Sequence, residues 1–217
     1  MVGARLVRTS GTLLLVGGLV LAVMNVFTAL AFPGDTPAQA EEPLWTPAFV
    51  ALVIGTMMLL FGAPVLYSRI AGPGGWMAQA GLVLIAIAGM GLGFFGSFMQ
   101  ALIVPWIASN DPSMLSASAP TPATFTGFYI VTGVIEALGL LALSVPLLRG
   151  RLQPRWAGAA LALAAVIGVL SVVIPGSGMS ANRLLSLLGA VPSVLLAVFF
   201  IEMGRRLLME PQQIPHH

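Results

Sequence analysis

The chain has 217 residues, of which 58% are hydrophobic and only 7% are charged. Soluble globular domains carry about 25% charged residues, so this composition excludes a water-exposed surface and predicts an integral membrane protein. Lysine and cysteine are absent, and histidine occurs only as His216 and His217, which excludes Schiff-base, P-loop, thiol and iron–sulfur chemistry and histidine-ligated metals inside the bundle. We therefore expect no covalent or metal-ligated cofactor, whereas a bound lipid or other lipophilic molecule fits the composition.

Six apolar runs predict the fold. A hydrocarbon core of roughly 30 Å needs about 20 apolar residues per helix. We expect an all-α bundle of six transmembrane helices in a single domain, 1–217, and the third run is long enough that it must tilt, bend or project, with Pro105 as its expected stop. The predicted spans are 11–32, 46–68, 76–107, 123–147, 156–175 and 183–204.

The arginines predict the orientation of these spans. Eight of them fall in segments that the six spans place on one side of the membrane, and Arg183 is alone on the other. Positive charge marks the cytoplasmic side, so we expect both termini in the cytoplasm and the protein in the plasma or inner membrane. The arginine excess is thus a topology signal, and we expect no nucleic-acid partner. The eight are Arg5, Arg8, Arg69, Arg149, Arg151, Arg155, Arg205 and Arg206.

The four tryptophans fall at the ends of predicted spans. This placement is typical of the aromatic belt, in which the ring anchors a helix at the membrane–water interface. We therefore expect all four to serve as interfacial anchors. They are Trp45, Trp76, Trp106 and Trp156.

Two further patterns concern chain organisation. The segment Ala38-Gln39-Ala40 resembles a signal-peptide cleavage site, but the preceding apolar run is longer than a typical signal sequence, so we expect a retained first span. Arg69 and Trp76, between the second and third predicted spans, recur 80 residues later as Arg149 and Trp156, between the fourth and fifth. A duplicated helical hairpin and independent topology rules both account for this recurrence.

The third span carries a formal G-x-G-x-x-G at 91–96. Dinucleotide binding needs this motif between a strand and a helix, whereas here it lies inside an apolar helix, so no nucleotide is expected. Small residues every fourth position instead predict a face for close helix packing, within the chain or in an oligomer. This face comprises Gly89, Gly93, Ser97 and Ala101.

Glu136 lies near the middle of the fourth span, where a charged carboxylate would be unpaired, so we expect the neutral acid facing the bundle interior. Thr132 and Tyr129 share its helix face, and Asn25 and Ser193 lie at similar depths in other spans. These five residues form the candidate intramembrane polar site. One interpretation is a proton- or ligand-binding site; the other is a protonated acid that links helices.

The missing acid, base, nucleophile and metal residues argue against an enzyme. The favoured function is a non-enzymatic accessory or scaffold subunit that packs against other membrane proteins, or against copies of itself, in lipid. The alternative is a small transporter or lipophilic-ligand binder that uses Glu136. Glu202 is expected to be structural, because Arg205 and Arg206 follow it by one helical turn.

Overall fold

The computed structural model of the chain describes residues 3–33, 36–115, 123–173 and 183–209, and the regular secondary structure in these ranges is helical throughout. The all-α prediction is confirmed for this part of the chain. The elements in order are α1 (Ala4–Ala31), α2 (Pro37–Ala40), α3 (Trp45–Ala88), the π-helical η1 (Gly89–Gly96) and η2 (Met99–Ile103), α4 (Val104–Asn110), the short helix η3 (Pro112–Leu115), α5 (Ala123–Leu148), α6 (Arg155–Val173) and α7 (Arg183–Met209).

Four helical stretches within the described ranges are long and apolar enough to cross a bilayer: Ala4–Ala31, Trp45–Asn110, Thr126–Leu148 and Ser186–Met209. A shorter apolar stretch, Arg155–Leu170, lies in α6. Helices satisfy every backbone hydrogen bond internally, which is required where lipid offers no partner. These stretches indicate a membrane protein.

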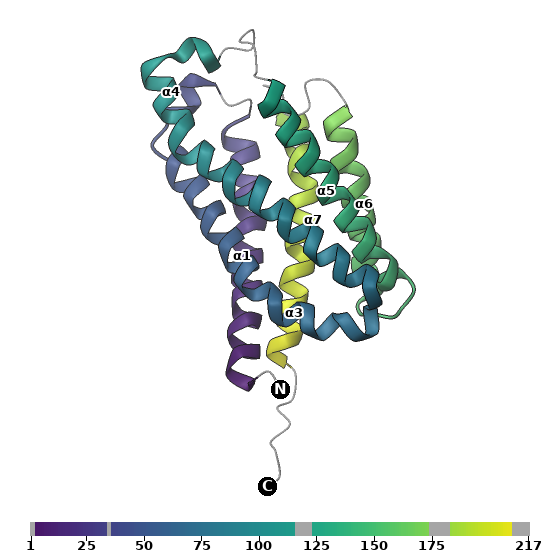
Figure 1. Cartoon of the computed structure of the whole chain (residues 1–217). Coiled ribbons are helices and arrows are strands. Elements are labelled where there is room, and N and C mark those ends of the chain that lie inside the picture. Colours follow the sequence, from purple (N-terminus) through teal and green to yellow (C-terminus); the bar gives the residue numbers. More distant parts are fainter. Residues whose placement is uncertain (1–2, 34–35, 116–122, 174–182, 210–217) are drawn as a thin grey trace.

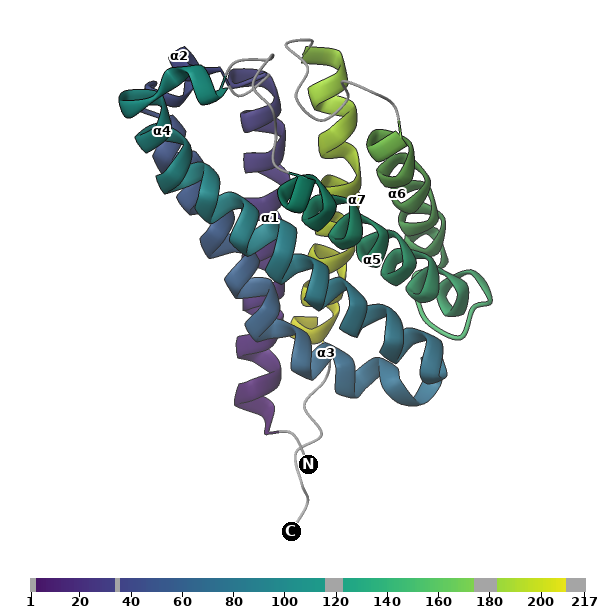
Figure 2. The same ribbon diagram turned by 45° about the horizontal axis from the view of Figure 1, so that its top comes forward.

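The stretch Trp45–Asn110 is folded back on itself. Gly75 interrupts α3 with φ 66° and ψ −168°, a conformation that residues with a β-carbon rarely adopt. The chain turns there and returns beside itself as the second arm of α3, continued by η1, η2 and α4 (Figures 1 and 2). The two ends of this hairpin are joined: the Trp45 indole donates a hydrogen bond of 2.6 Å to the Gln100 carbonyl, and Thr46 donates one of 3.0 Å to the Ala101 carbonyl.

The long helices pack in a closed ring, in which α1 contacts α3, α3 contacts α5, α5 contacts α6, α6 contacts α7, and α7 returns to α1. Glycines allow the α1–α7 pair to approach closely. A β-carbon at Gly204 would lie 2.6 Å from the Gly11 carbonyl oxygen, and one at Gly18 would lie 2.9 Å from that of Ala197. The first and last long helices are therefore neighbours, and the ring encloses the interior of the bundle.

Trp45 differs from the interfacial anchor that the sequence predicts. Its side chain is fully buried, and its ring packs against Phe32 and Phe49 under the short helix α2. The reason is its indole hydrogen bond to the returning arm, which draws the ring inward. The other three tryptophans are exposed, as the anchor interpretation requires, and are Trp76, Trp106 and Trp156.

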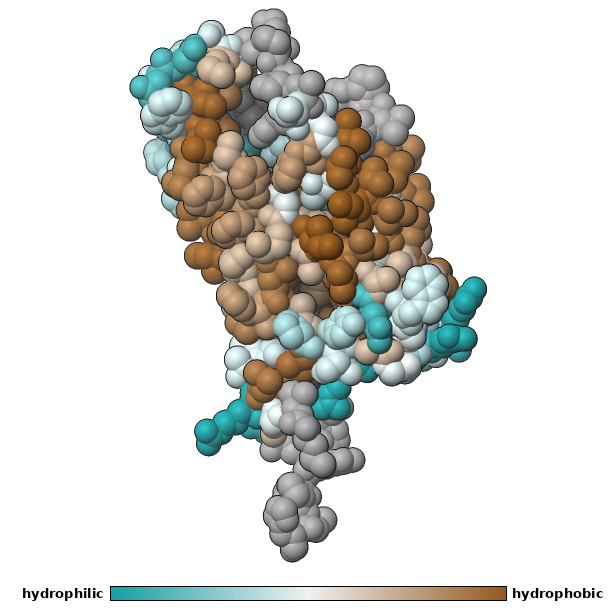
Figure 3. Space-filling view, in the orientation of Figure 1, coloured by the Kyte–Doolittle hydropathy of each residue, from teal (hydrophilic) through white to brown (hydrophobic). Residues whose placement is uncertain are grey.

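The surface separates into an apolar band and polar ends. Figure 3 shows hydrophobic residues across the middle of one face and hydrophilic residues at its lower end. The start of α1, the Gly75 turn, the α5–α6 connection and the end of α7 all lie at that lower end (Figure 1). These segments carry every arginine of the described residues except Arg183, which begins α7 at the opposite end.

The third predicted span, 76–107, ends differently from expectation. Pro105 does not stop the helix: it lies in the first turn of α4, which continues to Asn110. A proline is tolerated there because its missing N–H is not needed in a first helical turn. Two π-helical segments, η1 and η2, precede it, so the long arm accommodates its length partly through wider turns.

Candidate functional site

A cavity of about 170 Å³ lies inside the ring of helices. Its walls come from α1, both arms of α3, η1, α5 and α7. An engineered apolar protein cavity of about 150 Å³ holds a benzene molecule, so this cavity is large enough for a small ring or a short chain. Its polar lining residues are Asn25, Thr56, Ser97, Glu136 and Ser193.

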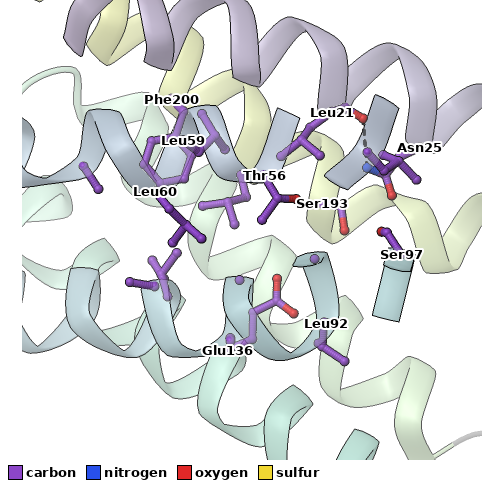
Figure 4. Close-up of a pocket in the computed structure, with 18 of the residues that line it drawn as sticks. Leu21, Asn25, Thr56, Leu59, Leu60, Leu92, Ser97, Glu136, Ser193 and Phe200 are labelled. Carbon is purple, nitrogen blue, oxygen red and sulfur yellow. Dashed lines mark hydrogen bonds between the residues drawn. The ribbon is translucent and has the colours of Figure 1, made fainter. Parts of the chain in front are cut away.

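Polar side chains are concentrated toward one part of this cavity. Asn25, Ser97 and Ser193 gather toward one end, and Leu59, Leu60 and Phe200 toward the other (Figure 4). An occupant with one polar end and one apolar end matches this division, because each part would meet its own kind of wall.

Glu136 reaches the cavity from α5, and its carboxyl group points toward the side where Thr56 and Ser193 lie (Figure 4). The side chain is half-buried, and no hydrogen bond or ion pair to it is found among the described residues. No residue lining the cavity carries a positive charge. An ionised carboxylate would therefore lack a counter-charge, whereas a neutral carboxyl group offers one O–H donor and one carbonyl acceptor to an occupant.

Thr56, on the first arm of α3, is the lining residue that sequence reasoning missed. It is buried, and its Oγ1 has no hydrogen-bond partner within the described part of the chain. Serine and threonine in helices usually donate to a carbonyl of the preceding turn, as Thr132 does to Phe128 at 2.7 Å. The hydroxyl of Thr56 is therefore an unused hydrogen-bonding group at the cavity wall.

The five residues of the sequence-predicted site fall into two sets. Asn25, Glu136 and Ser193 line the cavity, whereas Thr132 and Tyr129 do not. Asn25 donates through Nδ2 to the Leu21 carbonyl at 2.8 Å, which directs its amide along α1. Thr132 and Tyr129 instead lie beside η1, where Thr132 packs against Gly91 and Tyr129 against Gly96.

The predicted small-residue face is turned toward the first arm of α3 in the same chain. Gly89, Gly93 and Ser97 line the cavity, and the buried Ala101 accepts the hydrogen bond from Thr46. Gly93 lies directly against Thr56: a β-carbon there would be 2.9 Å from both Oγ1 and Cγ2 of the threonine. The absence of a side chain at this position leaves room for the threonine and the cavity beside it.

Glu202 is paired as the sequence predicts. Its carboxylate accepts a hydrogen bond of 2.9 Å from Arg205 Nε and one of 2.7 Å from Arg206 Nε, so the predicted pairing is confirmed. It lies near the end of α7, outside the cavity lining. The two histidines, His216 and His217, fall outside the described residues.

Comparison of the chain with protein-family models, curated proteins and solved structures found no match. No group of three or more His, Cys, Asp or Glu side chains that could hold a metal ion is found among the described residues.

Proposed function

We propose that the chain crosses the membrane six times, with both termini in the cytoplasm. The membrane is the plasma membrane or the inner membrane of the cell. The two arms of α3 count as separate crossings, because the hydrogen bond between Trp45 and Gln100 holds their far ends together. A straight helix of 66 residues would also extend about 100 Å at 1.5 Å per residue, about three times the hydrocarbon thickness. The short α6 supplies the fifth crossing.

We propose that the cavity binds a small, uncharged, lipophilic molecule with one hydrogen-bonding group. The observation that carries this proposal is the meeting of two hydrogen-bonding side chains without described partners, Glu136 and Thr56, at one cavity inside the ring. Buried polar groups are normally satisfied, so an occupant that pairs with them is the simplest explanation for their retention.

The division of the cavity suggests how the ligand lies. Its hydroxyl or carbonyl group would meet Glu136 and Thr56, and its apolar part would extend toward Leu59, Leu60 and Phe200. A charged ligand is disfavoured because no lining residue carries an opposite charge when Glu136 is neutral. We propose no catalytic step, because the lining has no histidine or lysine to activate its hydroxyl groups and no metal-ligand set beyond this single acid.

The accessory-subunit function favoured by the sequence receives less support from the geometry. One of its arguments is the small-residue face of Gly89, Gly93, Ser97 and Ala101, and that face lies against the chain's own α3 arm and cavity. Small residues on this face are thus explained without a second protein. Partners in a larger complex remain a prediction from composition alone.

Fluorine NMR tests the binding proposal with two probes that differ in one group. Para-fluorobenzyl alcohol and para-fluorotoluene have rings that fit the cavity, and only the first carries a hydroxyl group. We expect saturable line broadening of the alcohol by the detergent-solubilised protein, and weaker broadening of the toluene. Glu136→Leu should remove the difference between the probes, and Glu136→Gln should keep part of it, since an amide still donates and accepts.

Glu202→Gln is the matched control, because it removes an acid near the end of α7, at a position outside the cavity. It should leave both probes unchanged. Equal broadening of the alcohol by the wild type and by Glu136→Leu would contradict the proposal. A wild type that broadens neither probe would contradict it as well.

A further inference from the structure

A second cavity, of about 110 Å³, lies at the arginine-bearing end of the bundle. It forms where the turn of α3 meets the end of α5 and the α5–α6 connection. Gly74, Gly75 and Trp76 contribute one wall, and Pro146, Arg149 and Arg151 contribute the other. It shares no lining residue with the cavity that contains Glu136.

The positive charge at this second cavity has no compensating acid nearby. The side chains of Arg149 and Arg151 are both exposed, and neither guanidinium group makes a hydrogen bond or ion pair that is found among the described residues. Gly150, between them, has φ 72°, and the Arg155 guanidinium lies across it, since a β-carbon there would be 2.6 Å from Nη2. Three guanidinium groups thus share one short connection.

The described acids lie elsewhere, and Glu136 among them lines the other cavity. Glu41, Glu42 and Asp111 lie at the opposite end of the bundle, in the segments that flank the Trp45–Asn110 hairpin. Glu202 is held by Arg205 and Arg206. An anion that enters the cavity would therefore meet two guanidinium groups without competition, and guanidinium groups match the oxygen geometry of phosphate.

The remaining lining is apolar and aromatic. Met77 and Val145 contribute hydrophobic side chains, and Trp76 is 75% exposed beside them. Figure 3 shows that hydrophilic residues at this end border directly on the apolar band. A free phosphate would use only the arginines, whereas a phospholipid would place its phosphate on them and its glycerol and upper acyl chain against Trp76 and Met77.

From this combination we infer that the second cavity is a binding site for an anionic phospholipid, with Arg149 and Arg151 on the phosphate and Trp76 against the lipid backbone. The site is independent of the proposed ligand cavity. It gives the arginines of the α5–α6 connection a specific ligand in addition to their part in orienting the protein.

The fluorescence of Trp76 reports whether a lipid occupies the site. Phosphatidylglycerol brominated on the upper acyl chain quenches nearby tryptophan fluorescence, and the full-length protein is titrated with it in phosphatidylcholine vesicles. The component of the quenching that a Trp76→Phe variant lacks reports the site. We expect this component to saturate at a low fraction of phosphatidylglycerol and to be much weaker with brominated phosphatidylcholine.

Replacing Arg149 and Arg151 together by Gln should weaken this binding about 30-fold, because each basic group near an anionic lipid contributes a factor of about five. The matched control is Arg5→Gln with Arg8→Gln, which removes the same charge at the same end of the bundle, in the first turns of α1. The control pair should leave the Trp76 component unchanged. Circular dichroism of each variant verifies that its helices are intact.

Three outcomes would overturn the inference. An equal loss of phosphatidylglycerol binding in the Arg149/Arg151 variant and in the Arg5/Arg8 variant would show general electrostatic attraction to the surface instead of a specific site. Full displacement of the lipid by soluble glycerol phosphate would show that the ligand is a free phosphate compound. Retention of binding in a folded Arg149/Arg151 variant would show that these residues do not hold the headgroup.

Discussion

At the scale of single residues, the hydroxyl group of Thr56 is the least expected feature of the bundle. It is buried without a partner among the described residues, although its own helix offers carbonyl groups one turn away. Leaving a buried hydroxyl unpaired costs about 1–3 kcal/mol, so an occupant that pairs with Thr56 recovers free energy that the empty protein lacks. Removing this hydroxyl group should therefore have opposite effects on the stability of the empty protein and on ligand binding.

Thr56→Val should stabilise the empty protein by about 1 kcal/mol, because valine has nearly the same shape and no unpaired hydroxyl. The same variant should bind para-fluorobenzyl alcohol more weakly. Thr132→Val is the matched change, since Thr132 is equally buried but donates to the Phe128 carbonyl, and it should destabilise by about 0.5–1 kcal/mol. Thermal unfolding of the detergent-solubilised proteins measures both effects, and a clear loss of stability in Thr56→Val would show that its hydroxyl is already paired.

The sequence shows which single residues stand out, but not how each is used. Glu136 is recognisable because an acid inside an apolar run is costly and rare. Thr56 is not recognisable in this way, because threonine in a helix usually bonds to its own backbone, and only the structure shows that the hydroxyl of Thr56 has no such partner among the described residues. The sequence also predicts an interfacial anchor at Trp45, because it does not show that the Trp45 indole bonds to the Gln100 carbonyl across the hairpin.

At the scale of elements, the π-helical segment η1 positions the cavity. Two of its glycines, Gly89 and Gly93, line the cavity but differ in their surroundings. A β-carbon at Gly93 would lie 2.9 Å from Thr56, whereas one at Gly89 would have Leu60 Cδ2 as its nearest neighbour, at 3.8 Å. The two positions thus form a natural pair for testing whether the close contact of η1 with α3 matters.

Gly93→Ala should destabilise the protein by about 1–3 kcal/mol, because the added methyl group must displace Thr56 or separate the two arms of α3. It should also reduce binding of para-fluorobenzyl alcohol, since Thr56 and the α3 arm that would shift form part of the cavity wall. Gly89→Ala adds the same methyl group in ordinary van der Waals contact and should change the unfolding temperature little. Equal effects of the two substitutions on unfolding and on probe binding would contradict this account of η1.

Helix positions are predictable from hydropathy, and helix junctions are not. The apolar runs at 11–32, 123–147 and 183–204 correspond to α1, α5 and α7, because burial in lipid requires long apolar segments. The turn at Gly75 depends on one residue with positive φ, in a segment that reads as a plain loop between two spans. The π-helical turns of η1 and η2 leave no distinct mark in a hydropathy pattern, so the sequence does not show that Pro105 begins a new helical segment instead of ending one.

At the scale of the whole molecule, the ring of helices and the separation of charge point to the same topology. The ring brings α1 and α7 together, so the start of the first long helix and the end of the last lie at one end with the Gly75 turn and the α5–α6 connection. Positive charge gathers at this end, which is the distribution that the proposed cytoplasmic orientation of both termini predicts. The sequence predicts this arrangement from loop charges alone, since topology depends on a few charges and not on packing detail.

Two crossing schemes make opposite predictions for two exposed positions. If the α3 hairpin and α6 both cross, six crossings place Met114 outside the cell and Gln153 in the cytoplasm. If only the four long stretches cross, each in one pass, the two positions exchange sides. Both side chains are exposed, and the chain has no cysteine, so a single introduced thiol reports one position without background.

Met114→Cys should react with a membrane-impermeant maleimide in intact cells, and Gln153→Cys should react only after permeabilisation. This expectation follows from the hydrogen bonds that hold Trp45 and Thr46 beside Gln100 and Ala101, because they place both ends of the hairpin on one side of the bilayer. Labelling by a permeant maleimide controls for the reactivity of each thiol. The reverse pattern would favour four crossings, and it would also require the hairpin at Gly75 to open, since Trp45 and Gln100 would then lie at different depths.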